Sequence, residues 1–355
     1  MIRIGLLGGS SQVGASVAFF LKGFPEVKVT CFIRSAYSEV FFRMLDIECD
    51  RIDMRDEALL QAKIGQFDVI LDFAYPSGQL HEILHRSKQN TGKILHAMKK
   101  GSAYFYMSSI MAYGMPDEET WIRHCRLPRT SYSYIKRSIE KYAFSRGKKE
   151  GVKIFNFRLG QVHGFLQSVN GSFRKKLSET NIAMLNGNPE DPVNIIFINQ
   201  LCEAILQCAR GVNPPGLYTL VSKPQWSLRQ LYEYYIKYYD LQTHLLFRPE
   251  EKKKPGKSIF QKGIDLAKPY RPLLETYILM RMPALATGVK GRFRQSEMLQ
   301  HSSAPGQEFG YIDFNLLGSP PFEMISGLTS DPDEIMKIEK DHESTYNSII
   351  LSRRQ

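Results

Sequence analysis

The first 165 residues alternate between short apolar runs and stretches in which apolar positions recur every three or four residues. Short apolar runs bounded by glycine or polar residues predict buried strands, and the wider spacing predicts helices. Strands that alternate with helices in this way predict βαβ units and a doubly wound parallel sheet, an α/β fold. The predicted strands are Ile2–Leu7, Val27–Ile33, Phe67–Ala74, Ala103–Met107 and Val152–Phe157, and the clearest helices between them are 11–22 and 93–99.

The pattern is less regular after residue 165. A helix is predicted over Asn199–Ala209 and a strand over Gly216–Val221, while Asn170–Asn188 has the character of an insertion. Beyond residue 245 the basic run Lys252–Lys257 includes a proline and a glycine, which is typical of a solvated loop or linker. We therefore divide the chain into 1–165, 166–245, with some segments returning to the first sheet, and a basic extension over 246–355.

Composition places the chain among ordinary globular proteins. Of its 355 residues, 43% are hydrophobic and 23% are charged, which excludes a largely disordered chain. No apolar run approaches the roughly 18 residues of a membrane span, and the N-terminal segment lacks the features of a signal peptide. The five cysteines are scattered and form no CxxC pair, so we expect free thiols, no bound metal and a cytoplasmic protein.

The formal net charge of +11 suits polyanionic ligands, among them nucleotide phosphates, or an acidic membrane surface. The basic residues are spread along the chain and form no recognisable nucleic-acid module. We therefore do not expect nucleic acid as a partner.

A glycine-rich segment joins the first predicted strand to the first predicted helix. A turn of this kind lets the backbone approach a pyrophosphate, and the following helix offers unpaired N–H groups and a favourable dipole. A glycine turn without a ligand is the alternative interpretation. The residues expected to contact a dinucleotide here are Gly8, Ser10, Ser11, Gln12, Val13 and Gly14.

Further dinucleotide contacts are expected where later strands end. Arg34 follows the second strand, and no acidic residue occurs between Val27 and Ser38. An acid at this point accepts from the ribose 2′-hydroxyl of NAD, whereas a cation suits the 2′-phosphate of NADP. Arg34 therefore favours NADP, with NAD left open, although an exposed arginine at a strand end is the simpler alternative. Asp53 and Met54 are placed to contact the adenine amine, and Ala74 ends the strand Phe67–Ala74.

A tyrosine and a lysine four residues apart form the candidate catalytic pair. On a helix, Tyr132 and Lys136 share one face. An ammonium group beside a phenol favours the phenolate, and so lowers a pKa that is otherwise about 10. Such a tyrosine can exchange a proton with an alcohol or carbonyl while hydride moves to or from a nicotinamide. Ser109, just after the strand Ala103–Met107, supplies a third polar group.

These segments together resemble the extended short-chain dehydrogenase/reductases, in particular the nucleotide-sugar epimerase/dehydratase branch. The matches run in order over about residues 1–240. The early ones are a GxxGxxG-like loop with Ser11 at the middle glycine, Ser109 before Tyr113, Tyr132 with Lys136, and Glu140 at the family's usual offset. The later ones are Arg158–Gly164, similar to "R-P-x-x-x-Y-G" but with Leu159 and His163; Ile196–Ala204, similar to "V-D-D-x-x-x-A" but with Asn199; and Gly216–Leu220, similar to "G-x-Y-N".

The resemblance implies a Rossmann-like NAD(P)-binding domain over 1–165 and a smaller C-terminal lobe that binds a nucleotide sugar over 166–245. Within that fold, Ser109 would hydrogen-bond the substrate oxygen and Tyr132 would act as general acid and base. Lys136 would tune Tyr132 and bind the cofactor ribose. The resemblance also implies a homodimer built on the helix that carries Tyr132 and Lys136.

The two residues directly after Ser109 narrow the reaction. The family's dehydratases carry an Asp-Glu pair there, whereas this chain has Ile110 and Met111. We therefore expect a reductase or an epimerase rather than a 4,6-dehydratase, with a non-catalytic dinucleotide-binding sensor or scaffold as the alternative. His163, His124 and Cys125 are candidates for a further acid or base, although a lone histidine more often has a structural role.

Two basic segments each allow two interpretations. Arg174, Lys175 and Lys176 suit either a substrate diphosphate or a solvated helix face. The apolar and basic stretch Tyr277–Arg294 suits either a peripheral contact with an acidic membrane or a helix packed on the core.

Overall fold

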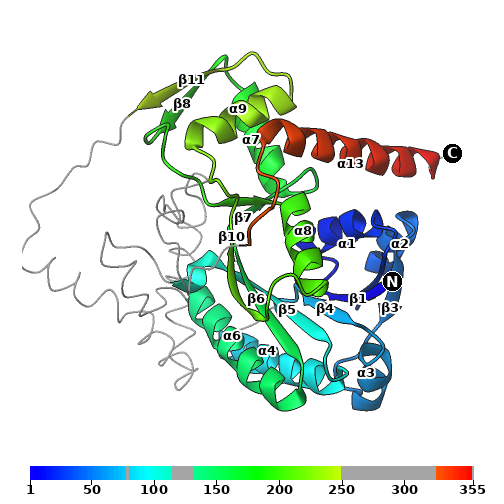
Figure 1. The fold of residues 1–355 in the computed structure, drawn as a ribbon. Coiled ribbons are helices and arrows are strands. Elements are labelled where there is room, and N and C mark those ends of the chain that lie inside the picture. The colour runs from blue at the N-terminus through cyan, green and yellow to red at the C-terminus, as the bar shows by residue number, and fades with distance from the viewer. Residues whose placement is uncertain (77–79, 114–130, 249–324, 354–355) are drawn as a thin grey trace, which may run out of the picture.

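A seven-stranded parallel sheet forms the centre of the larger lobe (Figure 1), with strand order β10-β6-β5-β4-β1-β2-β3. The computed structural model describes residues 1–76, 80–113, 131–248 and 325–353, so Lys252–Lys257, Tyr277–Arg294, His124 and Cys125 lie outside the described residues. The strands of the sheet are β1 (Ile2–Leu7), β2 (Val27–Ile33), β3 (Glu48–Arg51), β4 (Val69–Asp72), β5 (Ala103–Ser109), β6 (Lys153–Leu159) and β10 (Gly216–Leu220).

Helices cover both faces of this sheet, as a fully parallel sheet requires. Leu6, Phe105 and Leu201 belong to the apolar core on one face, and Ile70 and Ile139 belong to the core on the other. The doubly wound, Rossmann-like α/β fold expected from the sequence is therefore confirmed. The first face is covered by α1 (Gln12–Lys22), α2 (Ala36–Met44) and α8 (Ile198–Ala209), and the second by α3 (Glu57–Ile64), α4 (Leu80–Ala97) and α6 (Ser131–Glu150).

The strand register brings three strand ends to one edge of the sheet. Leu7 on β1 lies beside Asp72 on β4, and Asp72 lies beside Tyr106 on β5. Strand β1 stands between β2 and β4, so the chain order reverses there. In open parallel sheets, ligands bind at the carboxyl ends of the strands at such a reversal.

The smaller lobe is built around aromatic side chains. Phe173 stacks on Tyr235 with ring centroids 4.4 Å apart, and Phe197 lies 5.1 Å from Trp226. The stretch Asn170–Asn188 is an ordered part of this lobe and supplies most of one helix and one strand. The elements of the lobe are the parallel pairs β7 (Gln161–His163) with β9 (Ile195–Phe197) and β8 (Ile182–Asn186) with β11 (His244–Arg248), and the helices α7 (Ser168–Ser178) and α9 (Leu228–Tyr238).

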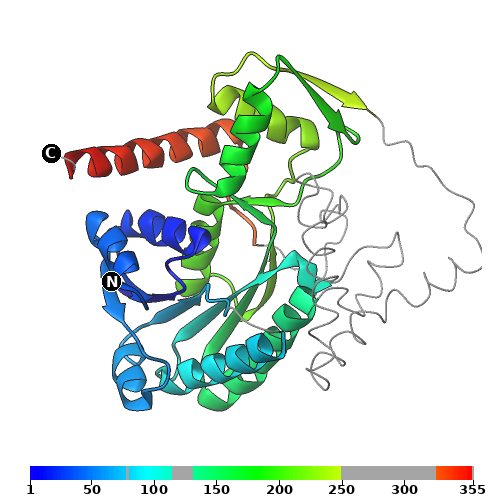
Figure 2. The ribbon, with the colours of Figure 1, turned by 180° about the vertical axis from the view of Figure 1, so that it is seen from behind.

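The last helix, α13 (Pro332–Ser352), contacts both lobes. His342 stacks on Phe20 of α1 with centroids 4.0 Å apart, while the Tyr238 hydroxyl of α9 donates to Glu343 at 2.6 Å. Figure 2 shows α13 running from the smaller lobe across α1. None of the helices in the described ranges has the length and apolar character needed to cross a membrane.

Candidate active site

The glycine-rich loop folds as a tight turn between β1 and α1. Gly8 has a φ of +72°, and a Cβ on it would lie 2.6 Å from the backbone nitrogen of Ala74. A Cβ on Gly14 would lie 2.6 Å from the Gly8 carbonyl oxygen. Both positions therefore require glycine, because the backbone itself fills the space. Ser11 is the N-cap of α1, and its hydroxyl accepts from the Gly14 N–H at 3.1 Å.

The exposed side of the loop is formed by Ser10, Ser11 and Gln12, while Val13 is half-buried. The first turn of α1 is also held by the smaller lobe, a contact that the sequence did not predict. The Gln167 amide donates to the Gln12 carbonyl at 3.1 Å, and the Ser168 hydroxyl donates to the Gln12 side chain at 3.1 Å. The start of α7 thus fixes the helix end that would face a pyrophosphate.

The outer part of the candidate dinucleotide site carries opposite charges. Arg34 is exposed just beyond β2, beside Ser35, the N-cap of α2. Asp53 is engaged by its neighbour, since the Arg55 guanidinium donates to it at 2.7 Å and helps to lower the pKa of this exposed carboxyl to about 2. The Met54 carbonyl accepts from Lys93 at 3.1 Å.

Lys136 and Ser109 come together at the carboxyl end of β5. Ser109 is the last residue of that strand, and its hydroxyl accepts from the Met111 N–H at 3.3 Å. Lys136 is buried on α6 and donates to the Met107 carbonyl at 2.7 Å. The Lys136 Nζ lies 5.6 Å from the ring centroid of Tyr132, one turn earlier on the same helix.

Two further tyrosines surround the lysine. The Lys136 Nζ lies 5.0 Å from the ring centroid of Tyr106 and 5.4 Å from that of Tyr75, distances at which a cation is attracted to an aromatic ring. The Tyr75 and Tyr132 ring centroids are 5.5 Å apart. No local motif in the sequence marks Tyr75 or Tyr106, although Tyr75 directly follows the expected contact Ala74.

A buried carboxyl group, that of Asp72, lies beside Tyr106 in the sheet. Asp72, the last residue of β4, is 6% exposed. Its Oδ1 accepts from the Ala74 N–H at 2.9 Å, and its Oδ2 accepts from the Tyr104 hydroxyl at 2.5 Å. Burial raises the pKa of Asp72, while Tyr104, the Ala74 N–H and the charge of Lys136 act in the opposite direction. In the sequence, Asp72 stands out only as a polar residue within an apolar run.

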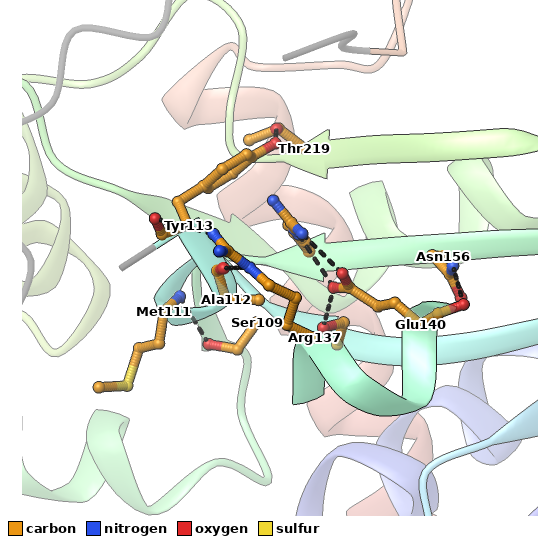
Figure 3. Close-up of polar contacts among 10 residues, drawn as sticks. Ser109, Met111, Ala112, Tyr113, Arg137, Glu140, Asn156 and Thr219 are labelled. Carbon is orange, nitrogen blue, oxygen red and sulfur yellow. Dashed lines mark hydrogen bonds and ion pairs between the residues drawn. The ribbon is translucent and has the colours of Figure 1, made fainter. Parts of the chain in front are cut away.

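Next to Ser109, the end of β5 is attached to a buried ion pair that joins β6 to α6 (Figure 3). Arg158 donates to Glu140 through Nε at 2.9 Å and through a terminal nitrogen at 2.6 Å. The Ser108 hydroxyl donates to the same carboxylate at 2.5 Å. The Arg158 guanidinium also lies 4.1 Å from the ring centroid of Tyr113. Glu140 thus links strand, helix and turn around the candidate serine.

Comparison with known families agrees with this arrangement. The model of the NAD dependent epimerase/dehydratase family matches residues 4–206, more than half of the chain. The chain belongs to this family. Comparison with curated proteins gives no significant match.

Solved structures share the fold of this family member at low sequence identity. UDP-N-acetylglucosamine 4-epimerase from Bacillus cereus is 15% identical, with a TM-score of 0.52 over 72% of this chain and 91% of that one. The Bordetella bronchiseptica enzyme WbmH, solved with NAD+, is 18% identical, with a TM-score of 0.52 over 71% and 87%. dTDP-glucose 4,6-dehydratase from Bacillus anthracis is 17% identical, with a TM-score of 0.53 over 70% and 85%.

In this epimerase/dehydratase-family chain, His163 lies in the interior of the smaller lobe and contacts other residues of that lobe. It is fully buried, and burial lowers its pKa to about 3, so the imidazole is neutral. Its Nδ1 lies 2.5 Å from the Tyr235 hydroxyl, which donates to Asn170 at 2.8 Å, and its Nε2 lies 3.1 Å from the Gln161 Oε1. These contacts hold β7 to α7 and α9 rather than offering a base to a ligand.

The three basic residues on α7 are all exposed, and two of them also contact tyrosines of the smaller lobe. Arg174 and Lys175 are exposed, and the Arg174 guanidinium lies 5.4 Å from the Tyr239 ring centroid. Lys176 donates to the Tyr232 hydroxyl at 3.1 Å. Among the residues described by the structure, no group of three or more metal-ligating side chains could hold a metal ion.

Proposed function

We propose that this chain is an NAD(P)-dependent oxidoreductase or epimerase that transfers hydride at a carbon of a nucleotide-activated sugar. The observation that carries the proposal is the buried Lys136 ammonium, which lies 5.6 Å from the Tyr132 ring centroid and is bound to the carbonyl of Met107, two residues before Ser109 on β5. The site lies at the sheet edge where the glycine-rich loop ends β1. Membership of the epimerase/dehydratase family supports this assignment.

Each residue of the triad has a distinct role in the proposed reaction. A bound nicotinamide supplies or accepts the hydride. Tyr132 donates or removes the proton at the sugar oxygen, and Ser109 hydrogen-bonds that oxygen. Lys136 is held in place by the Met107 carbonyl, and its charge stabilises the negative charge that develops on the Tyr132 oxygen.

The residues around the glycine-rich loop fit a dinucleotide. Gly8 and Gly14 allow the tight turn that leads into α1, while Ser10, Ser11 and Gln12 present polar groups at the start of that helix. Arg34 is exposed at the end of β2, where it would pair with a 2′-phosphate, so we propose NADP as the preferred cofactor. NAD is the second choice, because solved relatives such as WbmH bind NAD+.

The turn after Ser109 favours a reductase or an epimerase. Ile110 and Met111 begin the 3₁₀ helix there and supply no carboxylate for the elimination of water. We propose that the sugar binds between the triad and the smaller lobe, and that the protein works in the cytoplasm as a homodimer. The alternative is a dinucleotide-binding sensor or scaffold without turnover.

The test is to identify the nicotinamide that the purified protein carries. The protein is denatured, the supernatant is analysed by mass spectrometry, and the empty protein is titrated with NADPH and NADH. Retained oxidised cofactor supports an epimerase, and an empty site that prefers NADPH supports a reductase. Failure of both dinucleotides to bind overturns the proposal, and binding without turnover of any nucleotide sugar leaves the scaffold.

A further inference from the structure

The buried carboxyl group of Asp72 has no role in the proposed triad, yet it lies at the same edge of the sheet, one strand away from Ser109. Strand register places Asp72 beside Tyr106, whose ring lies 5.0 Å from the Lys136 Nζ. Its second hydrogen-bond partner, Tyr104, lies on the same face of β5 as Tyr106. Helix α6 covers this face and places Lys136 over the Tyr106 ring, so the Lys136 charge acts on Asp72.

The charges of Asp72 and Lys136 affect which redox form of the cofactor binds more tightly. An oxidised nicotinamide ring carries a positive charge, and the reduced ring is neutral. If the nicotinamide binds beside Lys136, the ammonium group would oppose binding of the oxidised form. Opposite charges in a buried pocket interact much more strongly than in water, because the surroundings screen them less.

We propose that Asp72 is a positioning residue that supplies the counter-charge to Lys136, so that the pocket binds the oxidised nicotinamide beside the lysine. This inference rests on the proposed function. Asp72 also fixes the Ala74 backbone against which Gly8 packs. One carboxylate thus joins the cofactor turn to the catalytic pair.

The groups that face Asp72 identify its electrostatic surroundings. Strand β5 contributes Tyr104 and Tyr106, helix α6 contributes Lys136, and β1 contributes the apolar Leu7. The charge of Lys136 lowers the pKa of Asp72, in opposition to burial.

Asp72→Asn tests the charge and largely preserves the shape. The amide oxygen still accepts from the Ala74 N–H, while the negative charge is lost. The matched control is Asp68→Asn, which removes a carboxylate at the opposite end of the same strand, where Lys99 and Arg3 pair with it. The affinities of the oxidised and reduced dinucleotide are measured separately by titration of the full chain, with NADP(H) and with NAD(H).

The ratio of the affinity for the oxidised dinucleotide to that for the reduced dinucleotide tests the role of Asp72. In Asp72→Asn the preference for the oxidised over the reduced form is expected to fall by about tenfold, and in Asp68→Asn it is expected to stay unchanged. An unchanged ratio in folded Asp72→Asn overturns the inference. If the wild-type chain binds no dinucleotide at all, the proposed function fails instead, and the two failures are distinguishable.

A second variant covers the case in which Asp72→Asn does not fold. Tyr104→Phe keeps the carboxyl group and removes the hydroxyl donor that favours its ionised form. In the wild-type chain the preference for the oxidised form is expected to decline as the pH falls and Asp72 takes up a proton. In Tyr104→Phe this decline is expected at a higher pH. Identical pH profiles in the two proteins would contradict the role of Asp72.

Discussion

The carboxyl group of Glu339 on the C-terminal helix accepts a hydrogen bond from the backbone N–H of Phe165 at 2.8 Å, across 174 positions of sequence. Glu339 is 2% exposed, and burial raises its pKa to about 8, against the effect of the Phe165 N–H. The contact fastens α13 to the loop that follows Gly164. It links the end of the chain to the junction between the sheet and the smaller lobe.

The stability of the fold is expected to depend on pH through Glu339. Between about pH 4.5 and about 8, the folded chain holds a proton that the unfolded chain releases. The free energy of unfolding therefore falls as the pH rises through this window, by at most about 1.4 kcal/mol per pH unit. Glu339→Gln should match the wild type at the acidic end and exceed it at the alkaline end. Melting temperatures across this range check the effect, with exposed Glu179→Gln as the control; parallel curves for Glu339→Gln and wild type would contradict it.

Gly8 is expected to be essential to the dinucleotide site. Gly8→Ala combines a positive φ with a Cβ placed 2.6 Å from the Ala74 nitrogen, so it should cost about 1–3 kcal/mol of stability and weaken dinucleotide binding. Gly171→Ala is the control, because a Cβ at that position on α7 meets nothing within 4 Å. The control should stabilise the chain by up to about 1 kcal/mol. Chemical denaturation and dinucleotide titration of both variants measure the two effects, and equal behaviour would count against the loop geometry.

The buried ion pair next to Ser109 is expected to be far more sensitive than a surface pair. Arg158→Met leaves the Glu140 carboxylate buried without its cation and should destabilise the fold by about 3–5 kcal/mol. Lys237→Met removes one member of the exposed pair with Asp333 and should cost about 0–1 kcal/mol. The free energies of unfolding in denaturant compare the two. A small effect of Arg158→Met would mean that the pair does not hold β6 to α6.

Arg34 is expected to select the cofactor. Arg34→Ser removes the cation at the end of β2, and NADPH binding should weaken by roughly 10- to 100-fold, the loss expected for hydrogen bonds to a charged group. NADH binding should change little, because NADH lacks the 2′-phosphate. Arg210→Ser, a change on the surface near Glu26, is the control. Equal weakening of NADH and NADPH in Arg34→Ser would assign the arginine no part in selectivity.

Much of the larger lobe is predictable from local pattern. Buried parallel strands are continuous apolar runs, so their positions are visible in the sequence, and the glycine-rich turn and the Tyr132–Lys136 spacing are local as well. The predicted ends of the helices and strands are less accurate than their positions. Helix α4 runs over Leu80–Ala97 rather than 93–99, because its first turns are mostly polar. Strand β4 is shorter than Phe67–Ala74, since Asp72 turns back onto the Ala74 N–H and ends it.

The remaining features depend on contacts between distant segments. Tyr106 faces Lys136 only because β5 lies beneath α6, and Gln167 reaches α1 only because the smaller lobe packs there. In the sequence, Glu339 is one of several charged residues on an amphipathic helix, and nothing near it predicts that it is buried. His163 was a candidate acid or base by residue type, and its contacts with the lobe show a packing role.

The central claim is that Tyr132 moves a proton while hydride passes to or from a nicotinamide. The most direct measurement is a single turnover of the dinucleotide-loaded chain with nucleotide sugars, followed through the absorbance of the reduced nicotinamide. The wild-type chain should show a change in that absorbance. Tyr132→Phe should bind the dinucleotide as tightly and react about 10²- to 10⁴-fold more slowly. An equal rate in Tyr132→Phe would contradict the claim.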